Sequence, residues 1–206
     1  MADQIITLAQ SARRAARALT TTSVESRNVA LEAIVRGLEA AREQVEAANQ
    51  EDLAAARDMV EKGELAAPLV PRLDVSGAKF AEKILKTVRG VEQQPDPLGR
   101  TQSATELDEG LELFRVSVPI GVLGVIFESR PDALVQIVAL CLKSGNAVLL
   151  KGGREALRTN QVLAEVIARA SAEVKGIPAG WIVLLETRED VRALLDRHPH
   201  EAHEQI

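Results

Sequence analysis

VPIGVLGVIFESRP (residues 118–131) and LKSGNAVLLKGG (residues 142–153) are the two stretches that say most about the architecture. Each contains a short, nearly continuous apolar run, over residues 122–127 and 147–150, and each run is followed by charged residues or glycines. An apolar run of this kind is typical of a parallel strand that is covered on both faces. A helical pattern separates the two runs, so together they predict a strand–helix–strand unit with a right-handed crossover.

The same alternation of strand and helix continues toward the end of the chain. The first expected helix is capped by Asp132 and ends at Ser144 and Gly145, and a second helix covers residues 155–170. A turn over residues 176–180 then leads into a strand over 181–185. The last expected helix covers residues 191–197 and is capped by Thr187 and Asp190. Three strands alternating with helices predict an α/β fold with an open, Rossmann-like parallel sheet.

The first 90 residues carry helical spacing of apolar side chains instead. Thr22 and Glu25 have the spacing of a capping box and predict the start of a long helix through residue 48. Asn49 is a candidate cap for a restart over residues 53–60, and Gly63 ends it. Pro68 and Pro71 predict a loop. A last helical stripe covers residues 80–91, and residues 93–100 form a connector rich in proline.

Residues 111–118 alternate between apolar and polar side chains. This pattern predicts a strand with one solvated face, as part of a hairpin. The edge of such a strand is suited to extending a sheet between protomers.

Composition excludes several classes of function. With 25 Lys and Arg against 30 Asp and Glu, the net charge of −5 gives no basic surface for nucleic acid. Aromatic residues make up 2% of the chain, too few for a base-stacking platform. The single cysteine, Cys141, excludes an internal disulfide framework and a cluster of cysteine metal ligands.

Targeting and membrane segments are not expected either. The longest apolar stretch, residues 118–127, is interrupted by proline and glycine and is far shorter than the ~20 residues that span a bilayer. Residues 1–19 mix charged and apolar side chains and lack the apolar core of a signal peptide. Their arginines leave an organelle transit peptide as the less favoured alternative, so we expect a cytoplasmic protein.

Polar side chains gather where the predicted strands end, at residues 127–131, 151–154 and 186–187. Open parallel sheets bind ligands beyond the carboxyl ends of their strands. At the second strand, Gly152 and Gly153 allow a ligand to approach the backbone, while Lys151, Arg154 and the start of a helix attract phosphate. The alternative is a tight turn with two solvated cations. The stretch matches neither the G-x-G-x-x-G nor the Walker pattern.

The end of the first strand offers two further candidates. Arg130 can clamp a carboxylate or a phosphate, and Ser129 can donate a hydrogen bond to a developing oxyanion. The alternative is a turn that enters a helix, with Pro131 among the first helical positions.

The other reactive side chains are weaker candidates. Cys141 lies within an apolar helical stretch, so we expect it in the core rather than as a nucleophile. His198, His200 and His203 stand in a terminal segment that is rich in glutamate, where Pro199 disturbs regular metal-ligand spacing. We therefore predict no metal site.

Both stretches quoted at the outset, with Thr159 and Asn160 after them, resemble the gamma-glutamyl phosphate reductases, also called glutamate-5-semialdehyde dehydrogenases, of the aldehyde dehydrogenase superfamily. The resemblance extends more weakly from the N-terminal helices to about Leu195. It implies NADPH-dependent reduction of L-glutamyl 5-phosphate to L-glutamate 5-semialdehyde in proline biosynthesis. It also implies a homo-oligomer in the full-length enzyme.

The resemblance also implies roles for the residues at the strand ends. Lys151 stands where the superfamily contacts the adenosine ribose of the cofactor, and Arg154 suits the 2′-phosphate of NADP. Ser129 stands where general aldehyde dehydrogenases carry an oxyanion asparagine. The implied cofactor contacts are Phe127, Glu128, Ser129, Lys151, Gly152, Gly153 and Arg154, and the implied substrate contact is Arg130.

The end of the chain departs from the family. The family's nucleophilic cysteine lies in a separate catalytic domain that nothing here matches, and residues 201–206 are too polar for the sheet strand expected next. We therefore expect a truncated chain without catalytic residues of its own. Its expected parts are an N-terminal helical segment (1–100), a strand or hairpin for oligomerisation (101–118), a partial NADP-binding α/β domain (119–200) and a divergent tail (201–206).

Two alternatives to the reductase remain open. One is a non-catalytic fragment that binds a dinucleotide or forms oligomers. The other is a structural fragment that pairs with full-length subunits through residues 111–118.

Overall fold

The predicted parallel sheet lies at the centre of the molecule. The computed structural model describes the backbone of residues 2–195 and the side chains of residues 5–195. Three parallel strands lie side by side in chain order: β3 (Val122–Ile126), β4 (Ala147–Lys151) and β5 (Ile182–Leu185). The helices that connect and follow them are α6 (Pro131–Lys143), η3 (Arg154–Ala156) with α7 (Leu157–Ala172), and α8 (Arg188–Leu195). The open parallel α/β fold is confirmed.

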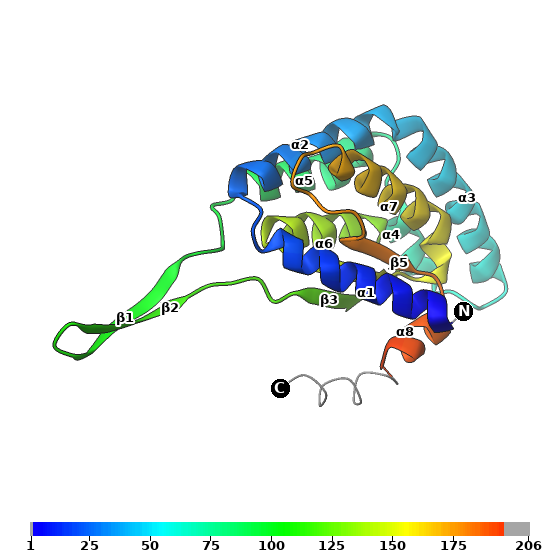
Figure 1. The fold of residues 1–206 in the computed structure, drawn as a ribbon. Helices are drawn as coiled ribbons and strands as arrows, with labels where there is room; N and C mark the ends of the chain where they lie inside the picture. Colours follow the sequence, from blue (N-terminus) through cyan, green and yellow to red (C-terminus); the bar gives the residue numbers. More distant parts are fainter. Residues whose placement is uncertain (1, 196–206) are drawn as a thin grey trace.

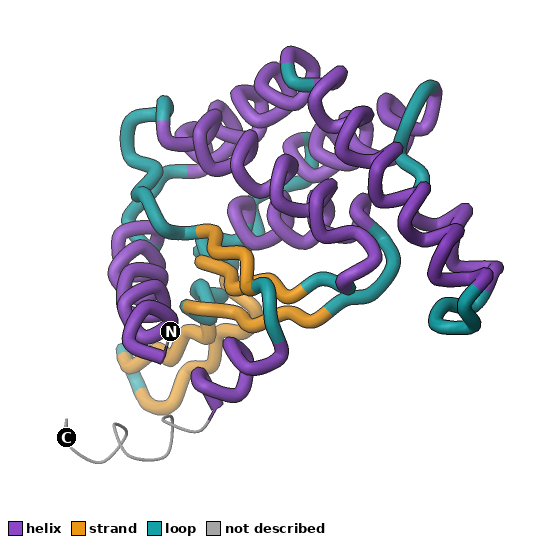
Figure 2. The backbone as a smooth tube through the Cα atoms, turned by 90° about the vertical axis from the view of Figure 1, so that its right-hand side faces the viewer, coloured by secondary structure: helices purple, strands orange, loops and turns teal. Residues whose placement is uncertain are grey.

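Helices cover both faces of this sheet. Helix α1 (Ala2–Leu19) contacts all three strands on one face, and α6 and α7 pack against the other (Figures 1 and 2). An outer layer packs on α6 and α7 and consists of α2 (Val24–Ala40), α3 (Arg42–Glu61) and α5 (Lys86–Glu92). One apolar core runs through all the layers, and its fully buried side chains include Leu19, Leu38, Leu142, Leu150 and Leu163. The N-terminal helices are therefore part of the structure that supports the sheet.

The N-terminal helices differ in detail from the sequence prediction. Ser23, not Thr22, caps α2, because its hydroxyl accepts a hydrogen bond from the Ser26 amide. The expected long helix breaks at Ala41. Pro68 and Pro71 do not form a loop, since each occupies an early position of a short helix, where proline lacks only an amide that would be unpaired anyway. The remaining elements of this region are η1 (Ala67–Leu69), α4 (Val70–Leu73) and the π-helical turn η2 (Phe80–Leu85).

Asn49 does not cap a helix but is buried in the middle of α3. Its amide nitrogen donates to the Leu73 carbonyl at 2.9 Å, and its oxygen accepts from the Val75 amide at 3.0 Å. One turn further along α3, the carboxylate of Asp52 accepts from the amide and the hydroxyl of Thr159, at 2.8 and 2.7 Å. These buried polar contacts fix the beginning of α7 against α3.

Of the two helix caps predicted near the sheet, the one at α6 is wrong and the one at α8 is confirmed. Asp132 does not cap α6: Arg130 occupies the cap position without a side-chain hydrogen bond, and Pro131 begins the helix. At α8 the predicted box is confirmed, because the Asp190 amide donates to the Thr187 hydroxyl at 3.1 Å and the Thr187 amide donates to the Asp190 carboxylate at 2.8 Å.

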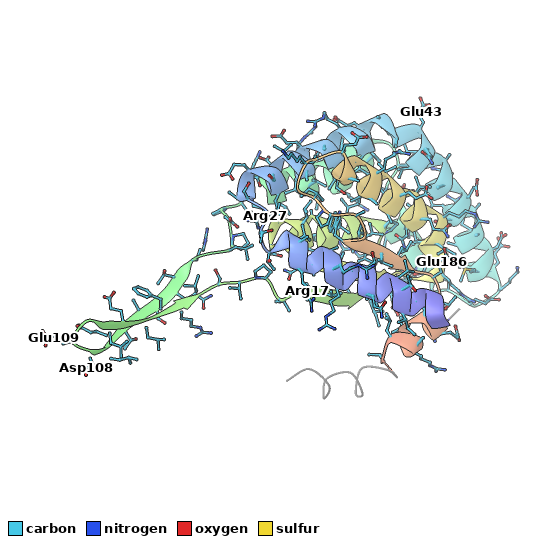
Figure 3. All side chains as sticks on the ribbon, in the orientation of Figure 1. Arg17, Arg27, Glu43, Asp108, Glu109 and Glu186 are labelled. Atoms are coloured by element: carbon cyan, nitrogen blue, oxygen red, sulfur yellow. The ribbon has the colours of Figure 1, made fainter. Side chains whose placement is uncertain are left out.

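A β-hairpin extends away from the helices and the sheet (Figure 1). It pairs β1 (Thr101–Asp108) with β2 (Leu111–Val116) in antiparallel register, and Gly110 adopts a φ of +75° at its tip. The predicted strand over residues 111–118 is confirmed in β2, but both of its faces are exposed rather than one. Figure 3 shows Asp108 and Glu109 at the tip, far from the remaining labelled residues.

β3 was expected to be buried on both faces and is instead an edge strand. Only β4 pairs with it among the described residues, and Ile126 is 69% exposed. β3 therefore carries more apolar surface than the described part of the chain buries. No helix within residues 2–195 is long and apolar enough to cross a membrane.

Candidate functional site

The carboxyl ends of the three strands meet at the end of the sheet opposite the hairpin (Figure 1). The turn after β3 and the turn after β4 are in direct contact. The Phe127 amide donates to the Lys151 carbonyl at 3.0 Å, which continues the pairing of the two strands beyond Ile126. The structure thus brings the first two predicted groups of residues together.

The two glycines after β4 leave room for neighbouring side chains. A Cβ atom on Gly152 would lie 2.4 Å from Nδ2 of Asn160 and 3.1 Å from Cζ of Phe127. A Cβ atom on Gly153 would lie 2.0 Å from Oε1 of Glu155. Larger residues would displace these side chains, so the two glycines allow Asn160, Phe127 and Glu155 to pack closely against the backbone after β4.

Ser129 is held by Glu155, a residue that the sequence did not single out. The amide and the hydroxyl of Ser129 both donate to Oε1 of Glu155, at 2.8 and 2.7 Å. Ser129 is buried and has a φ of +45°, in the left-handed region that L-residues rarely adopt. Because both of its donors are engaged, donation to an oxyanion requires Glu155 to release the hydroxyl. That role stays a prediction.

Lys151 lies at the centre of the strand ends. It is partly buried at the end of β4, and its ammonium group contacts the Gly152 carbonyl. Desolvation opposes the ionisation of Asp190, but hydrogen bonds from Thr187 and Glu186 and the positive charge of Lys151 outweigh it and lower the pKa of Asp190. Lys151 therefore also acts on the third strand end, after β5.

The two candidate arginines are exposed, and each forms an ion pair with a carboxylate. Arg154, with 70% of its side chain exposed, pairs with Glu64 at 3.0 Å. Arg130 pairs with Asp132 at 2.8 Å, and this hydrogen bond raises the pKa of the guanidinium. The exposed pair with Glu64 contributes about 0–1 kcal/mol, so the Arg154 guanidinium can turn toward an anion at small cost. Arg130 is held more firmly, because the Asp132 side chain is only 14% exposed and accepts from two nitrogens of the guanidinium. Glu128 is also exposed.

Asn160 is a second residue at this site whose contacts the sequence did not predict. Its side chain is 1% exposed, and its Oδ1 atom has no hydrogen-bond partner within the described chain. The resemblance includes Asn160 without assigning it a role, and its position at the beginning of α7, close to the residues after β4, is a second signal that could have placed it at this site.

Cys141 is confirmed as a core residue. It is 5% exposed, and burial raises the pKa of its thiol to about 11. A thiol in this state is not the thiolate that a nucleophilic cysteine requires. His198, His200 and His203 lie outside the described residues.

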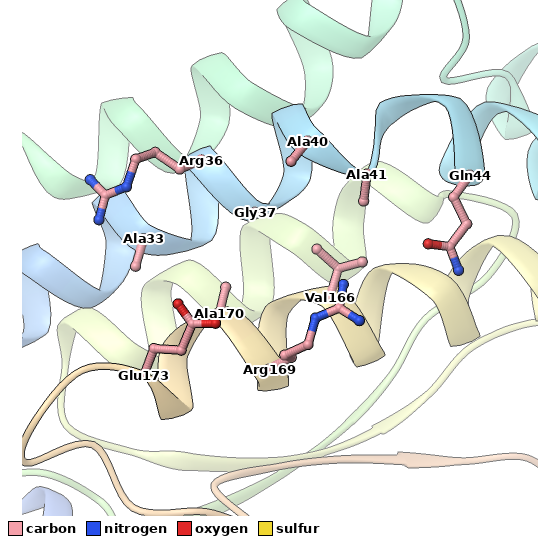
Figure 4. A pocket seen from close by; sticks show the side chains of 10 residues that line it. All are labelled: Ala33, Arg36, Gly37, Ala40, Ala41, Gln44, Val166, Arg169, Ala170 and Glu173. Atoms are coloured by element: carbon pink, nitrogen blue, oxygen red, sulfur yellow. The ribbon is translucent and has the colours of Figure 1, made fainter.

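A separate groove of about 380 Å³ lies between α2 and α7 (Figure 4). Val166, Arg169 and Ala170 of α7, with Glu173 just after it, form one wall, and residues from Ala33 to Gln44 form the other. This groove is far along α7 from the strand ends, which face the beginning of the helix. We assign it no role in the candidate site.

Comparison with known proteins connects this geometry to a family. The family model described as the aldehyde dehydrogenase family matches residues 1–203. Gamma-glutamyl phosphate reductase from Natronomonas pharaonis is 52% identical over 185 residues, which cover 90% of this chain and 41% of the relative.

Two crystal structures of gamma-glutamyl phosphate reductases superimpose on the chain. The Saccharomyces cerevisiae structure gives a TM-score of 0.81 at 41% identity, over 88% of this chain and 46% of that one. The Thermotoga maritima structure gives 0.80 at 32% identity, over 88% and 42%. The chain thus spans less than half the length of these relatives. By sequence and by fold, the chain belongs to the aldehyde dehydrogenase family, and within it resembles the gamma-glutamyl phosphate reductases.

Proposed function

We propose that the chain binds NADP(H) at the carboxyl ends of β3 and β4 and forms the cofactor side of a gamma-glutamyl phosphate reductase. The observation that carries this proposal is the contact between the turns after β3 and β4, with Lys151 between them and the beginning of α7 beside them. Parallel sheets bind dinucleotides at such strand ends. The names of the relatives support the reductase activity.

The side chains present fit a phosphorylated dinucleotide. Lys151 supplies an ammonium donor that the fold fixes at the end of a strand, which suits a ribose hydroxyl. Arg154 supplies a guanidinium, and the weak pair with Glu64 is readily exchanged for a phosphate dianion. The proposal therefore assigns Lys151 to the adenosine ribose and Arg154 to the 2′-phosphate of NADP(H).

The proposed reaction is the reduction of L-glutamyl 5-phosphate to L-glutamate 5-semialdehyde with release of phosphate, in proline biosynthesis. The bound nicotinamide would supply the hydride. The residues Phe127, Glu128 and Ser129 would line the nicotinamide half, and Arg130 would attract the negatively charged substrate. Cys141, the one cysteine in the sequence, is buried and protonated, so this chain contributes binding and orientation rather than the nucleophile.

Titration with NADPH, followed by the fluorescence of the nicotinamide, tests the proposal. We expect saturable binding, and we expect Lys151→Ala to raise the Kd about 10- to 100-fold, because a hydrogen bond from a charged group contributes about 1.5–3 kcal/mol. Lys175→Ala is the matched control, since Lys175 is exposed in the turn after α7, away from the strand ends. An unchanged Kd in Lys151→Ala would refute the cofactor assignment.

A further inference from the structure

We propose that Glu155 is a positioning residue for the dinucleotide site, and that its carboxylate holds the turn after β3 in the shape that binds the cofactor. This inference rests on the proposed function. It assigns a role to a residue that makes no proposed contact with the cofactor itself.

Glu155 joins the two loops between which the proposed site lies. It belongs to η3, which follows β4, whereas its partner Ser129 belongs to the turn between β3 and α6. One carboxylate oxygen accepts both the amide and the hydroxyl of Ser129, at 2.8 and 2.7 Å. Hydrogen bonds to a carboxylate are roughly twice as strong as those between neutral groups.

The backbone conformation of Ser129 depends on this contact. Ser129 is the one non-glycine residue with a positive φ in the described part of the chain. A left-handed conformation costs free energy for a residue with a Cβ atom, so it persists only where surrounding contacts compensate for it. The two bonds to Glu155 provide that compensation in this turn.

The turn is therefore fixed at two points. The Phe127 amide bonds to the Lys151 carbonyl at one end, and Ser129 bonds to Glu155 at the other. Glu128 lies between these anchors and is exposed. Removing the second anchor allows the turn to leave the left-handed conformation and carries Glu128 and Ser129 away from the end of β4.

Gly153 lies directly beside the carboxylate that makes the contact. A Cβ atom at this position would lie 2.0 Å from Oε1 and 2.4 Å from Oε2 of Glu155. The carboxylate thus occupies space that only glycine leaves free. Gly153→Ala should therefore displace the carboxylate while the glutamate itself is retained.

The experiment compares Glu155→Ala, Glu155→Gln and Gly153→Ala in the complete 206-residue chain. Amide hydrogen exchange of Ser129, measured by NMR, reports the contact, and NADPH titration reports its consequence. We expect Glu155→Ala and Gly153→Ala to speed exchange at Ser129 at least about tenfold and to raise the Kd for NADPH about tenfold. Glu155→Gln keeps an oxygen that accepts both bonds, so it should stay within about threefold of the wild type in both measurements.

Glu165→Ala is the control for the loss of a glutamate, because Glu165 is exposed on α7. Thermal unfolding of each variant verifies that the chain still folds. Faster exchange at Ser129 with an unchanged Kd would overturn the positioning role. Unchanged exchange in both Glu155→Ala and Gly153→Ala would show that Glu155 does not hold the turn and would overturn it as well.

Failure of the proposed function gives a different result. If the wild-type chain does not bind NADPH, the cofactor assignment fails for every variant, and the cofactor part of this inference fails with it. The exchange measurement then still decides whether Glu155 fixes the conformation of the turn.

Discussion

Burial determines the chemistry of Cys141 at the scale of a single residue. Its thiol is enclosed by the core that α6 forms with its neighbours, and the pKa rises from 9.0 to about 11. The neutral thiol is therefore favoured in the folded chain more than in the unfolded chain. This contribution to stability is fully present below pH 9 and is lost as the pH rises through 11.

We expect Cys141 to resist thiol reagents at pH 8 until the chain unfolds. Between pH 9 and 11, the free energy of unfolding should fall by up to about 2–3 kcal/mol more in the wild type than in Cys141→Ala, which lacks the titrating group. Denaturant unfolding at several pH values measures this difference. Rapid labelling of the native chain at pH 8 would contradict the assignment of Cys141 to the core.

The environment of a single residue could be predicted from the sequence where it depends on the residues next to it in the chain. Cys141 was assigned to the core correctly because apolar residues surround it in the sequence. The contact between Ser129 and Glu155 was not predicted, because it joins residues 26 positions apart through an unusual backbone conformation. Asn49 was misassigned for the same reason, since its partners Leu73 and Val75 lie in another segment.

At the scale of elements, α2 and α7 pack closely because small residues line their contact. A Cβ atom on Gly37 would lie 2.8 Å from Cβ of Ala170 and 3.6 Å from Cγ1 of Val166. Ala170 cannot rotate away from such a contact, since an alanine Cβ is fixed to the backbone, whereas the distance to Val166 is an ordinary van der Waals contact. The groove in Figure 4 runs along this same contact.

We expect Gly37→Ala to lower the free energy of unfolding by about 1–2 kcal/mol, because overpacking outweighs the gain in helix propensity. Gly90→Ala is the matched control. Gly90 is exposed in α5 and has no atom within 4 Å of the added methyl group, so this change should raise stability by about 0.5–1 kcal/mol. Denaturant melts of both variants measure the two effects, and equal shifts in the same direction would contradict the packing described for α2 and α7.

Elements were predictable where their apolar pattern is strong. The three sheet strands and their helices follow from such patterns, whereas the end of α3 was predicted from Gly63, which has a φ of +73°. β1 was not located as a strand of its own, because TQSATELD is polar and every residue of β1 is exposed beside its partner β2. The cap was assigned to Thr22 instead of its neighbour Ser23 because both carry a capping hydroxyl; in the structure the Thr22 hydroxyl donates to the Gly176 carbonyl at 3.1 Å instead. The break at Ala41 was missed because no glycine or proline marks it in the sequence.

At the scale of the whole molecule, exposed apolar side chains concentrate outside the layered core. The hairpin exposes Leu113 and Phe114, each more than half, and the edge strand β3 exposes Ile126. Patches of this kind mark surfaces that meet another part of a protein or another chain. They are consistent with the predicted homo-oligomer and with a chain that spans less than half of its relatives, and oligomer formation stays a prediction.

The central claim is that the carboxyl ends of β3 and β4 bind NADP(H), and hydrogen exchange across the whole chain with and without NADPH tests it most directly. We predict slower exchange in residues 122–131 and 147–158, which form the two turns and the strands that precede them. The α2–α7 groove and the hairpin should be unaffected. Unchanged exchange at both turns under saturating NADPH, or protection confined to the groove or the hairpin, would contradict the claim.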